Sequence, residues 1–132
     1  MKNFINIKDI SSADLKRILR DAKLRKKRRL NFENLVSDKD QPLNGKLLLQ
    51  MFEKPSSRTR LSFYIAIKQL GGDTLTLKSS EIHLGKGGES LADTAKILST
   101  FGDGFIFRTD SDKKINEFSK YLKIPLINGL SP

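Results

Sequence analysis

Short runs of apolar and β-branched residues alternate along the chain with longer segments in which apolar residues recur every three or four positions. The short runs occupy residues 46–52, 73–77, 105–108 and 124–128, and the periodic segments occupy residues 12–30, 56–70, 89–101 and 112–122. Runs of the first kind predict strands, and segments of the second kind predict helices. Because alternating strands and helices are typical of right-handed βαβ units, we predict an α/β fold. It has a four-stranded parallel sheet flanked by helices on both faces, and an N-terminal helix.

Polar and glycine-rich segments mark the boundaries between these elements. Residues 11–14, Ser-Ser-Ala-Asp, have the side chains that favour a helix start, and Gly71 and Gly72 form a helix stop. In parallel sheets of this kind, ligands bind beyond the carboxyl ends of the strands. We therefore expect the residues that follow the four strands, 53–59, 78–88, 108–110 and 128–132, to gather at one edge of the sheet.

The segment that follows the first strand carries a dense set of groups that bind anions. Ser56, Ser57 and Thr59 offer hydroxyls, and Arg58 and Arg60 offer cations, where a helix is predicted to begin. The free N–H groups and the positive dipole end of a helix start attract phosphate or carboxylate. Arg58 can donate two parallel hydrogen bonds to a phosphate, which a lysine cannot do. We predict a phosphate-binding turn, which is not a Walker loop because the glycine-lysine pattern of that loop is absent.

Single residues of this set also have purely structural interpretations. Ser56 alone is best explained as a helix N-cap. For Arg60, an internal ion pair with Glu53 is the alternative to a ligand contact. Arg108 ends an apolar strand, where it is either a ligand contact or a surface charge. His83 is the only histidine and lies in a glycine-rich loop, where a single histidine usually has no functional role.

Composition narrows the class of protein. The chain has 132 residues, of which 37% are apolar and 30% charged, and it has no cysteine. This favours one domain of ordinary size and gives no sign of a signal peptide or a membrane span. The lack of cysteine excludes disulfides and cysteine-based zinc sites, and we expect a cytoplasmic setting. Neither a catalytic triad nor spacing for metal ligands is present, so we expect no metal and no cofactor.

The net charge of +10 raises the alternative of a nucleic-acid-binding module. Nine lysines and arginines lie between Lys16 and Arg29, with Asp21 as the only acidic residue of that segment. Such a run could contact nucleic acid. The apolar residues at positions 15, 18, 19 and 22 instead indicate a helix with one solvated basic face. Because no aromatic residues are interleaved and no nucleic-acid-binding signature follows, we favour the solvated face and expect no nucleic-acid partner.

Four motifs in a fixed order resemble those of one enzyme family. Residues 52–60, Phe-Glu-Lys-Pro-Ser-Ser-Arg-Thr-Arg, look like the carbamoyl-phosphate signature of the aspartate and ornithine carbamoyltransferases. The later motifs are His-Leu-Gly at 83–85 with the helix start at 89–95, Asp-Gly-Phe-Ile-Phe-Arg at 103–108, and Pro-Leu-Ile-Asn-Gly-Leu-Ser at 125–131. The resemblance covers nearly the whole chain.

The resemblance implies roles for individual residues. The phosphate of carbamoyl phosphate would be held by Ser56, Ser57, Arg58 and Thr59, and the carbamoyl oxygen would be reached by Thr59 and Arg108. The catalytic residues would be Arg58, Thr59 and Arg108. It also implies a homotrimer in which His83 enters the site of a neighbouring subunit. The family usually has threonine where Ser57 stands, a change that keeps the hydroxyl.

The resemblance further favours ornithine as the acceptor. Residues 53–55, 82–85 and 128–131 are similar to the ornithine enzymes, whereas the aspartate enzymes generally have a lysine where Gly87 stands. The implied reaction transfers the carbamoyl group to the δ-amine of ornithine, giving citrulline and phosphate, in arginine biosynthesis or the arginine deiminase route. Aspartate or another amine is the alternative acceptor.

In this family, a His-Pro-x-Gln motif and a second, amino-acid-binding domain follow the segment that the chain resembles. The resemblance therefore implies that residues 1–132 are the carbamoyl-phosphate-binding domain alone. We expect such a chain to bind carbamoyl phosphate weakly and not to turn over ornithine. Two other classes remain as alternatives, the basic nucleic-acid-binding module and a non-catalytic interaction domain that keeps the trimer surface.

Overall fold

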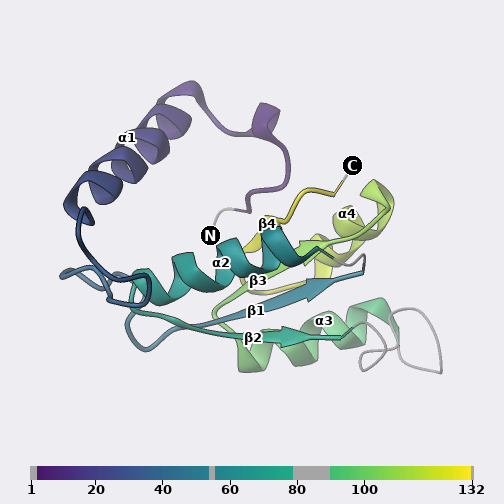
Figure 1. Ribbon diagram of the computed structural model, residues 1–132. Coiled ribbons are helices and arrows are strands. Elements are labelled where there is room, and N and C mark those ends of the chain that lie inside the picture. Colours follow the sequence, from purple (N-terminus) through teal and green to yellow (C-terminus); the bar gives the residue numbers. More distant parts are fainter. Residues whose placement is uncertain (1–2, 54–55, 79–89, 132) are drawn as a thin grey trace.

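The computed structural model describes residues 3–53, 56–78 and 90–131. Its centre is a sheet of four parallel strands in the order β2-β1-β3-β4 (Figure 1). The strands are β1 (Leu47–Phe52), β2 (Asp73–Leu77), β3 (Gly104–Arg108) and β4 (Leu126–Asn128). The predicted α/β fold and its four-stranded parallel sheet are therefore confirmed.

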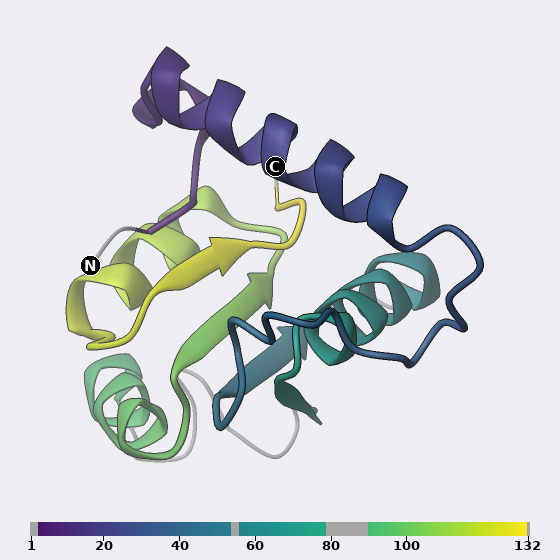
Figure 2. The same cartoon turned by 90° about the vertical axis from the view of Figure 1, so that its left-hand side faces the viewer.

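Helices lie on both faces of this sheet, as the sequence predicts. The helices of the described residues are the 3-10 helix η1 (Ile7–Asp9) and the α-helices α1 (Ser12–Arg28), α2 (Ser57–Gln69), α3 (Leu91–Phe101) and α4 (Asp112–Tyr121). One face packs against α2, and the opposite face packs against α3 and α4 (Figure 2). The sheet therefore lies between α2 on one side and α3 and α4 on the other.

The alternation of side chains along β1 explains why both faces of the strand are covered. Leu49 and Met51 join a core with α3, α4 and the aromatic rings of β3, whereas Leu48 faces Ile67 of α2. Successive side chains of a strand point to opposite faces, so a continuous apolar run suits a strand with helices on both sides. The cores hold β1 and β3 side by side, and their carboxyl ends come together.

Helix α2 ends at a glycine that the local geometry requires. Gly71 has φ of +86°, and a Cβ atom at this position would lie 2.7 Å from the Cβ atom of Gln41. The left-handed region is costly for residues with a side chain. The predicted helix stop at Gly71 and Gly72 is confirmed, and the following chain turns back into β2.

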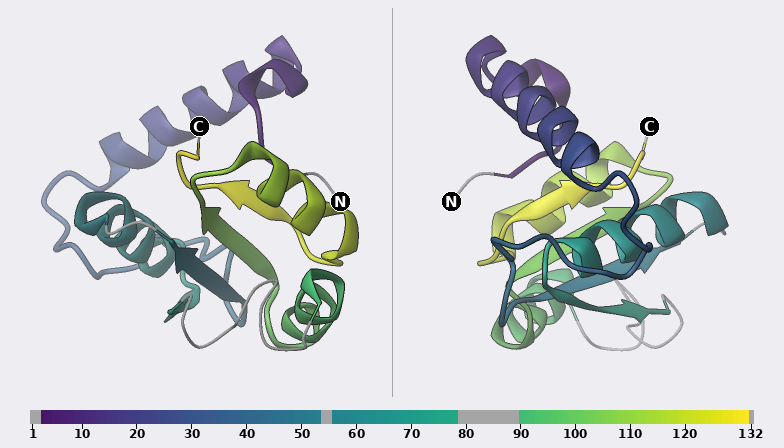
Figure 3. Two further views of the ribbon diagram at one scale, coloured as in Figure 1. Left: turned by 90° about the vertical axis from the view of Figure 1, so that its right-hand side faces the viewer. Right: turned by 60° about the vertical axis from the view of Figure 1, so that its left-hand side comes forward.

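Helix α1 extends away from the layers formed by the sheet and the other helices (Figures 1 and 3). None of its residues is buried, and Ile18 and Leu19 are 47% and 61% exposed. The apolar residues at helical spacing therefore do not form a core contact in this structure.

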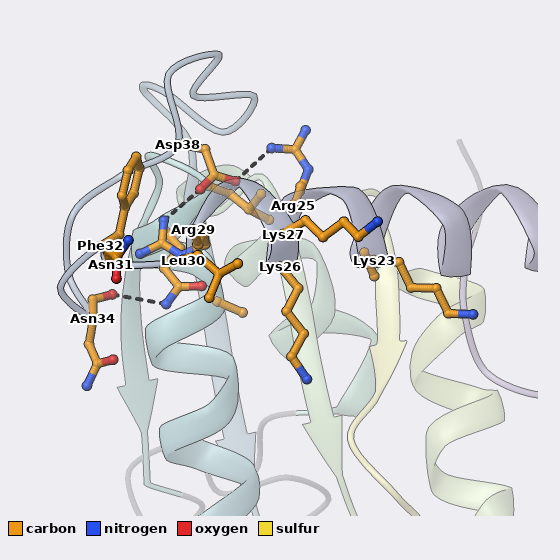
Figure 4. A pocket seen from close by; sticks show the side chains of 14 residues that line it. Lys23, Arg25, Lys26, Lys27, Arg29, Leu30, Asn31, Phe32, Asn34 and Asp38 are labelled. Atoms are coloured by element: carbon orange, nitrogen blue, oxygen red, sulfur yellow. Dashed lines mark hydrogen bonds and ion pairs between the residues drawn. The ribbon is translucent and has the colours of Figure 1, made fainter.

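Ion pairs connect the end of α1 to the loop that follows it (Figure 4). Arg25 contacts Asp38 at 2.8 Å, Asp40 at 2.7 Å and Asp21 at 2.9 Å, and Arg29 contacts Asp38 at 2.6 Å. The sequence-based view that Asp21 is the counter-charge of this basic segment is incomplete, because the loop supplies two further carboxylates. The basic segment is thus partly neutralised by its own chain.

These contacts set the ionisation of the loop carboxyl groups. Partial burial disfavours the charged form of Asp38, but hydrogen bonds from Arg29 and Arg25 outweigh it and hold the pKa of Asp38 below its ordinary value. The hydrogen bond from Arg25 likewise lowers the pKa of Asp40. Both carboxylates are therefore charged at neutral pH.

Candidate anion-binding site

The carboxyl ends of β1 and β3 lie next to each other. Phe52 and Arg108 are register partners on these two strands. One residue further on, the N–H of Glu53 donates a 2.9 Å hydrogen bond to the carbonyl oxygen of Arg108. The chain therefore leaves β1 beside Arg108 and then enters α2 at Ser57.

The guanidinium of Arg108 contacts the start of α2. Its Nη1 donates a 2.6 Å hydrogen bond to the Ser56 hydroxyl and a longer one, 3.3 Å, to the Thr59 hydroxyl. The side chains that the sequence singled out after two different strands are thus brought together at one edge of the sheet. Arg108 is half-buried and is not a solvated surface charge.

Several donors of this cluster have no acceptor within the described residues. Among those residues, nothing pairs with Nε or Nη2 of Arg108 or with the guanidinium of Arg58. The hydroxyls of Ser56 and Thr59 accept hydrogen bonds from Arg108, so each keeps its own proton to donate. The arrangement presents hydrogen-bond donors and positive charge around one position, which suits an anion.

The start of α2 differs from the starts of the other α-helices. In α1, α3 and α4, the hydroxyls of Ser11, Ser90 and Ser111 accept a hydrogen bond from a first-turn N–H, and an acidic residue lies in the first turn. Ser56 occupies the N-cap position of α2 but forms no capping hydrogen bond, and the first turn has no acidic residue. The interpretation of Ser56 as a side-chain cap is wrong, because its hydroxyl is held by Arg108 instead.

The ion pair between Arg60 and Glu53, the alternative to a ligand contact, is absent from the described residues. Both carboxylate oxygens of Glu53 instead accept hydrogen bonds from Nζ of Lys114 in α4, at 3.1 and 2.8 Å. Arg60, like Ser57 and Arg58, is exposed. Sequence analysis missed Lys114, because a lysine in the first turn of an amphipathic helix has no motif that distinguishes it from solvated lysines.

The end of β4 closes the other side of this edge. The N–H of Thr109 donates to the Ser131 hydroxyl at 2.9 Å, and the N–H of Ser131 donates to Oδ1 of Asn128 at 2.6 Å. Leu130 lies between these residues with φ of +79°, a conformation that is unusual for a bulky side chain. The fourth motif of the sequence therefore packs beside Arg108, as expected from the parallel strands.

His83 belongs to residues 79–89, which lie outside the described residues, so the role expected for His83 stays a prediction. Among the residues that the structure describes, no group of histidine, cysteine, aspartate or glutamate side chains has the arrangement of a metal site. Within the same ranges, no helix is long and apolar enough to cross a membrane.

A large groove lies at the opposite end of α2. It has a volume of about 910 Å³ and runs between the end of α1 and the end of α2 (Figure 4). Its lining includes Lys23, Lys26 and Lys27 together with Leu30 and Leu70. Because the carboxyl end of a helix carries the negative end of the dipole, this end of α2 lacks the anion-binding features of its start.

The sequence matches a known family over almost its full length. A family model described as the carbamoyl-phosphate-binding domain of aspartate/ornithine carbamoyltransferase matches residues 2–132. An ornithine carbamoyltransferase from Brucella ovis is 40% identical over 131 residues, which are 99% of this chain and 40% of the Brucella protein. The chain thus spans about 40% of the length of such relatives.

Solved structures with the same architecture carry related names. The ornithine carbamoyltransferase from Pyrococcus furiosus superposes with a TM-score of 0.87 at 35% identity, over 98% of this chain and 40% of that one. The catalytic subunit of the aspartate transcarbamoylase from M. jannaschii superposes with a TM-score of 0.79 at 35% identity, over 98% of this chain and 41% of that one. The arrangement of strands and helices is therefore shared with enzymes that are named for two different acceptors.

Proposed function

Because the chain belongs to the aspartate/ornithine carbamoyltransferase family, we propose that residues 1–132 form a carbamoyl-phosphate-binding domain. The observation that carries this proposal is the contact of Arg108 with the hydroxyls of Ser56 and Thr59 at the uncapped start of α2. Donors from two strand ends converge there, at the edge of the sheet where ligands of parallel α/β folds bind.

In this proposal the phosphate lies at the start of α2. Its oxygens accept hydrogen bonds from first-turn N–H groups and from the side chains of Ser56, Ser57, Arg58 and Thr59. The carbamoyl oxygen lies between Thr59 and Arg108. Arg108 is already held by two hydroxyls before the ligand binds, so little conformational freedom remains to be lost on binding.

The proposed transfer reaction needs no covalent enzyme intermediate. The neutral amine of the acceptor attacks the carbamoyl carbon, and a C–N bond forms while negative charge develops on the carbamoyl oxygen. The bond from carbon to the bridging oxygen then breaks, and phosphate leaves with that oxygen and takes up the proton that the amine loses. Arg108 and Thr59 stabilise the charge on the carbamoyl oxygen, and the groups at the start of α2 stabilise the leaving phosphate.

Ornithine is the acceptor that we propose for the transfer. Support comes from relatives named ornithine carbamoyltransferase at about 40% identity and from residues 128–131, whose pattern resembles the ornithine enzymes. Aspartate is the alternative, since a structure named for aspartate is also similar to this chain. We further propose that residues 1–132 supply the contacts to carbamoyl phosphate and not the contacts to the amino acid.

Assembly into a homotrimer, with His83 reaching a neighbouring site, is part of the same proposal. Sedimentation of the chain in the presence of carbamoyl phosphate tests the assembly. A trimer whose ligand affinity falls with the substitution His83→Ala supports it, and a monomer at all concentrations argues against it.

Thermal unfolding tests the binding proposal. Carbamoyl phosphate raises the melting temperature of any protein whose folded state it binds, so we expect a concentration-dependent rise for the unmodified chain. The substitution Arg58→Ala removes a phosphate ligand and should abolish this rise. Arg20→Ala removes the same charge from an exposed position of α1, which contributes no residue to the proposed site, and should leave the rise intact. An equal rise in all three proteins would refute the proposed site.

A further inference from the structure

Glu53 and Lys114 form an ion pair that connects the turn after β1 to α4. Nζ of Lys114 lies 2.8 and 3.1 Å from the two carboxylate oxygens of Glu53, and the Glu53 side chain is only 19% exposed. Lys114 is itself fixed at the start of α4, where its N–H donates to the Ser111 hydroxyl. A partly buried pair of this kind holds both side chains in defined positions.

The position of Glu53 makes its charge relevant to the anion site. The residue directly follows β1, three positions before Ser56 in the sequence, and its N–H donates to the carbonyl oxygen of Arg108. A free carboxylate here would attract the nearby arginines and repel a phosphate. In the structure, Nζ of Lys114 instead pairs with both oxygens of this carboxylate on the α4 side.

The two faces of the sheet separate the carboxylate from the ligand donors. Phe52 and Arg108 share a register position, and the Arg108 guanidinium reaches α2. Glu53, one residue later in the chain, turns its carboxylate toward α4 on the opposite face. Loss of the lysine would remove the contact that keeps it there.

We propose that Lys114 is a positioning residue for the anion-binding turn, holding the Glu53 carboxylate on the α4 side so that Arg108 and Arg58 remain available to the ligand phosphate. The inference rests on the proposed function of the α2 start as a phosphate site. It assigns to α4, which contributes no ligand contact, an effect on affinity. If the inference is correct, the loss of Lys114 weakens ligand binding because it frees the Glu53 carboxylate. Removing the charge of Glu53 as well then restores the affinity.

Calorimetric titration of the full chain with carbamoyl phosphate, and separately with inorganic phosphate, tests the inference. Lys114→Met keeps the length of the side chain and removes its charge, and we expect it to weaken binding about tenfold, as the release of a competing charge near the ligand would. Lys113→Met makes the same change of net charge at the exposed neighbouring position and should alter affinity less than about twofold. Lys114→Arg keeps the cation and should bind like the unmodified chain.

The double variant Lys114→Met with Glu53→Gln is decisive. If Glu53 competes with the ligand, removal of its charge restores the affinity to near that of the unmodified chain. A merely structural ion pair gives the opposite result, because the double variant then binds as weakly as Lys114→Met alone. Equal affinities of Lys114→Met and Lys113→Met would also overturn the inference.

Two further measurements keep the result interpretable. Glu53→Gln alone retains the lysine and should bind the ligand at least as tightly as the unmodified chain. This variant tests the inference if Lys114→Met does not fold. Weaker binding by Glu53→Gln would contradict the inference. Arg58→Ala distinguishes a failure of the positioning role of Lys114 from a failure of the proposed phosphate site. If it abolishes binding while Lys114→Met has no effect, only the role of Lys114 fails; if the unmodified chain does not bind or Arg58→Ala has no effect, the proposed site itself fails and the inference with it.

Discussion

Arg108 and Ser56 are 52 residues apart in the sequence, and Nη1 of Arg108 donates a 2.6 Å hydrogen bond to the Ser56 hydroxyl. This contact joins the end of β3 to the start of α2. It also explains why Ser56 stands at an N-cap position without capping the helix. Among the described residues, the partner of this hydroxyl is Arg108, which belongs to the site.

The first prediction concerns the Ser56 hydroxyl, which contacts Arg108 and does not cap α2. Ser56→Ala removes an anchor of Arg108, and we expect carbamoyl phosphate to bind roughly 10- to 150-fold more weakly, which corresponds to the about 1.5–3 kcal/mol of one charge-assisted hydrogen bond. The unfolding free energy should fall only by the contribution of the hydrogen bond to Arg108, because no helix cap is lost. Calorimetry and urea unfolding measure the two quantities.

Ser11→Ala provides the matched control. The Ser11 hydroxyl accepts a 3.1 Å hydrogen bond from the N–H of Asp14 at the start of α1. Its loss should cost about 1 kcal/mol of stability and leave ligand affinity unchanged. A stability loss for Ser56→Ala equal to that of Ser11→Ala, with intact affinity, would restore the interpretation of Ser56 as a cap.

The second prediction concerns acid stability. The pKa of Asp38 is below its ordinary value in the folded chain, so the unfolded chain takes up a proton at this residue first as the pH falls. The contribution of Asp38 is therefore complete above its unfolded pKa, close to 4, and is lost as the pH falls through the lower folded value. Urea unfolding at a series of pH values should show the unfolding free energy decreasing below about pH 4.

Asp38→Asn tests whether this residue causes the effect. The variant leaves Arg25 and Arg29 with weaker partners, and we expect a loss of about 1.5–3 kcal/mol at pH 7, together with a flatter dependence on pH below 4. Asp9→Asn, at an exposed position of η1, should keep the dependence of the unmodified chain. A profile for Asp38→Asn as steep as that of the unmodified chain would show that other carboxyl groups cause the acid sensitivity.

The third prediction separates two effects of glycine. Gly71 and Gly45 both have positive φ, +86° and +78°, but only Gly71 would bring a Cβ into contact, 2.7 Å from Gln41, while nothing lies within 4 Å of a Cβ at Gly45. Gly45→Ala should cost about 1 kcal/mol for the backbone conformation alone, and Gly71→Ala clearly more. Equal losses in urea unfolding would mean that the loop at Gln41 moves freely aside.

The alternation of strands and helices is readable from the sequence because a buried strand and an amphipathic helix have different periods. Parallel strands also bring their carboxyl ends to one edge, which is why Ser56, Thr59 and Arg108 could be grouped before the structure. The pairing of charged side chains, in contrast, could not be predicted from the sequence. Asp38 meets Arg25 and Arg29 through the path of an irregular loop, and Lys114 meets Glu53 across 61 residues. Neither pair follows from any periodicity. Arg60, the alternative partner that the sequence offered for Glu53, is exposed.

The fourth prediction concerns the basic residues of α1. Arg25 and Arg29 are engaged with carboxylates of the same chain, which reduces the charge available to a polyanion. We expect oligonucleotide binding to be weak, to fall with salt and to be unaffected by Arg58→Ala. Fluorescence anisotropy at increasing salt measures it. Tight, sequence-dependent binding in about 150 mM salt would favour the nucleic-acid-binding alternative.

The location of a bound anion tests the central claim most directly. A crystal structure of the chain with carbamoyl phosphate should place the phosphate against the first-turn N–H groups of α2, with its oxygens within about 3 Å of Arg58 and the Ser56 hydroxyl and with the carbamoyl oxygen beside Arg108. The contradicting result is an empty α2 start with the anion bound instead in the basic groove formed by Lys23, Lys26 and Lys27.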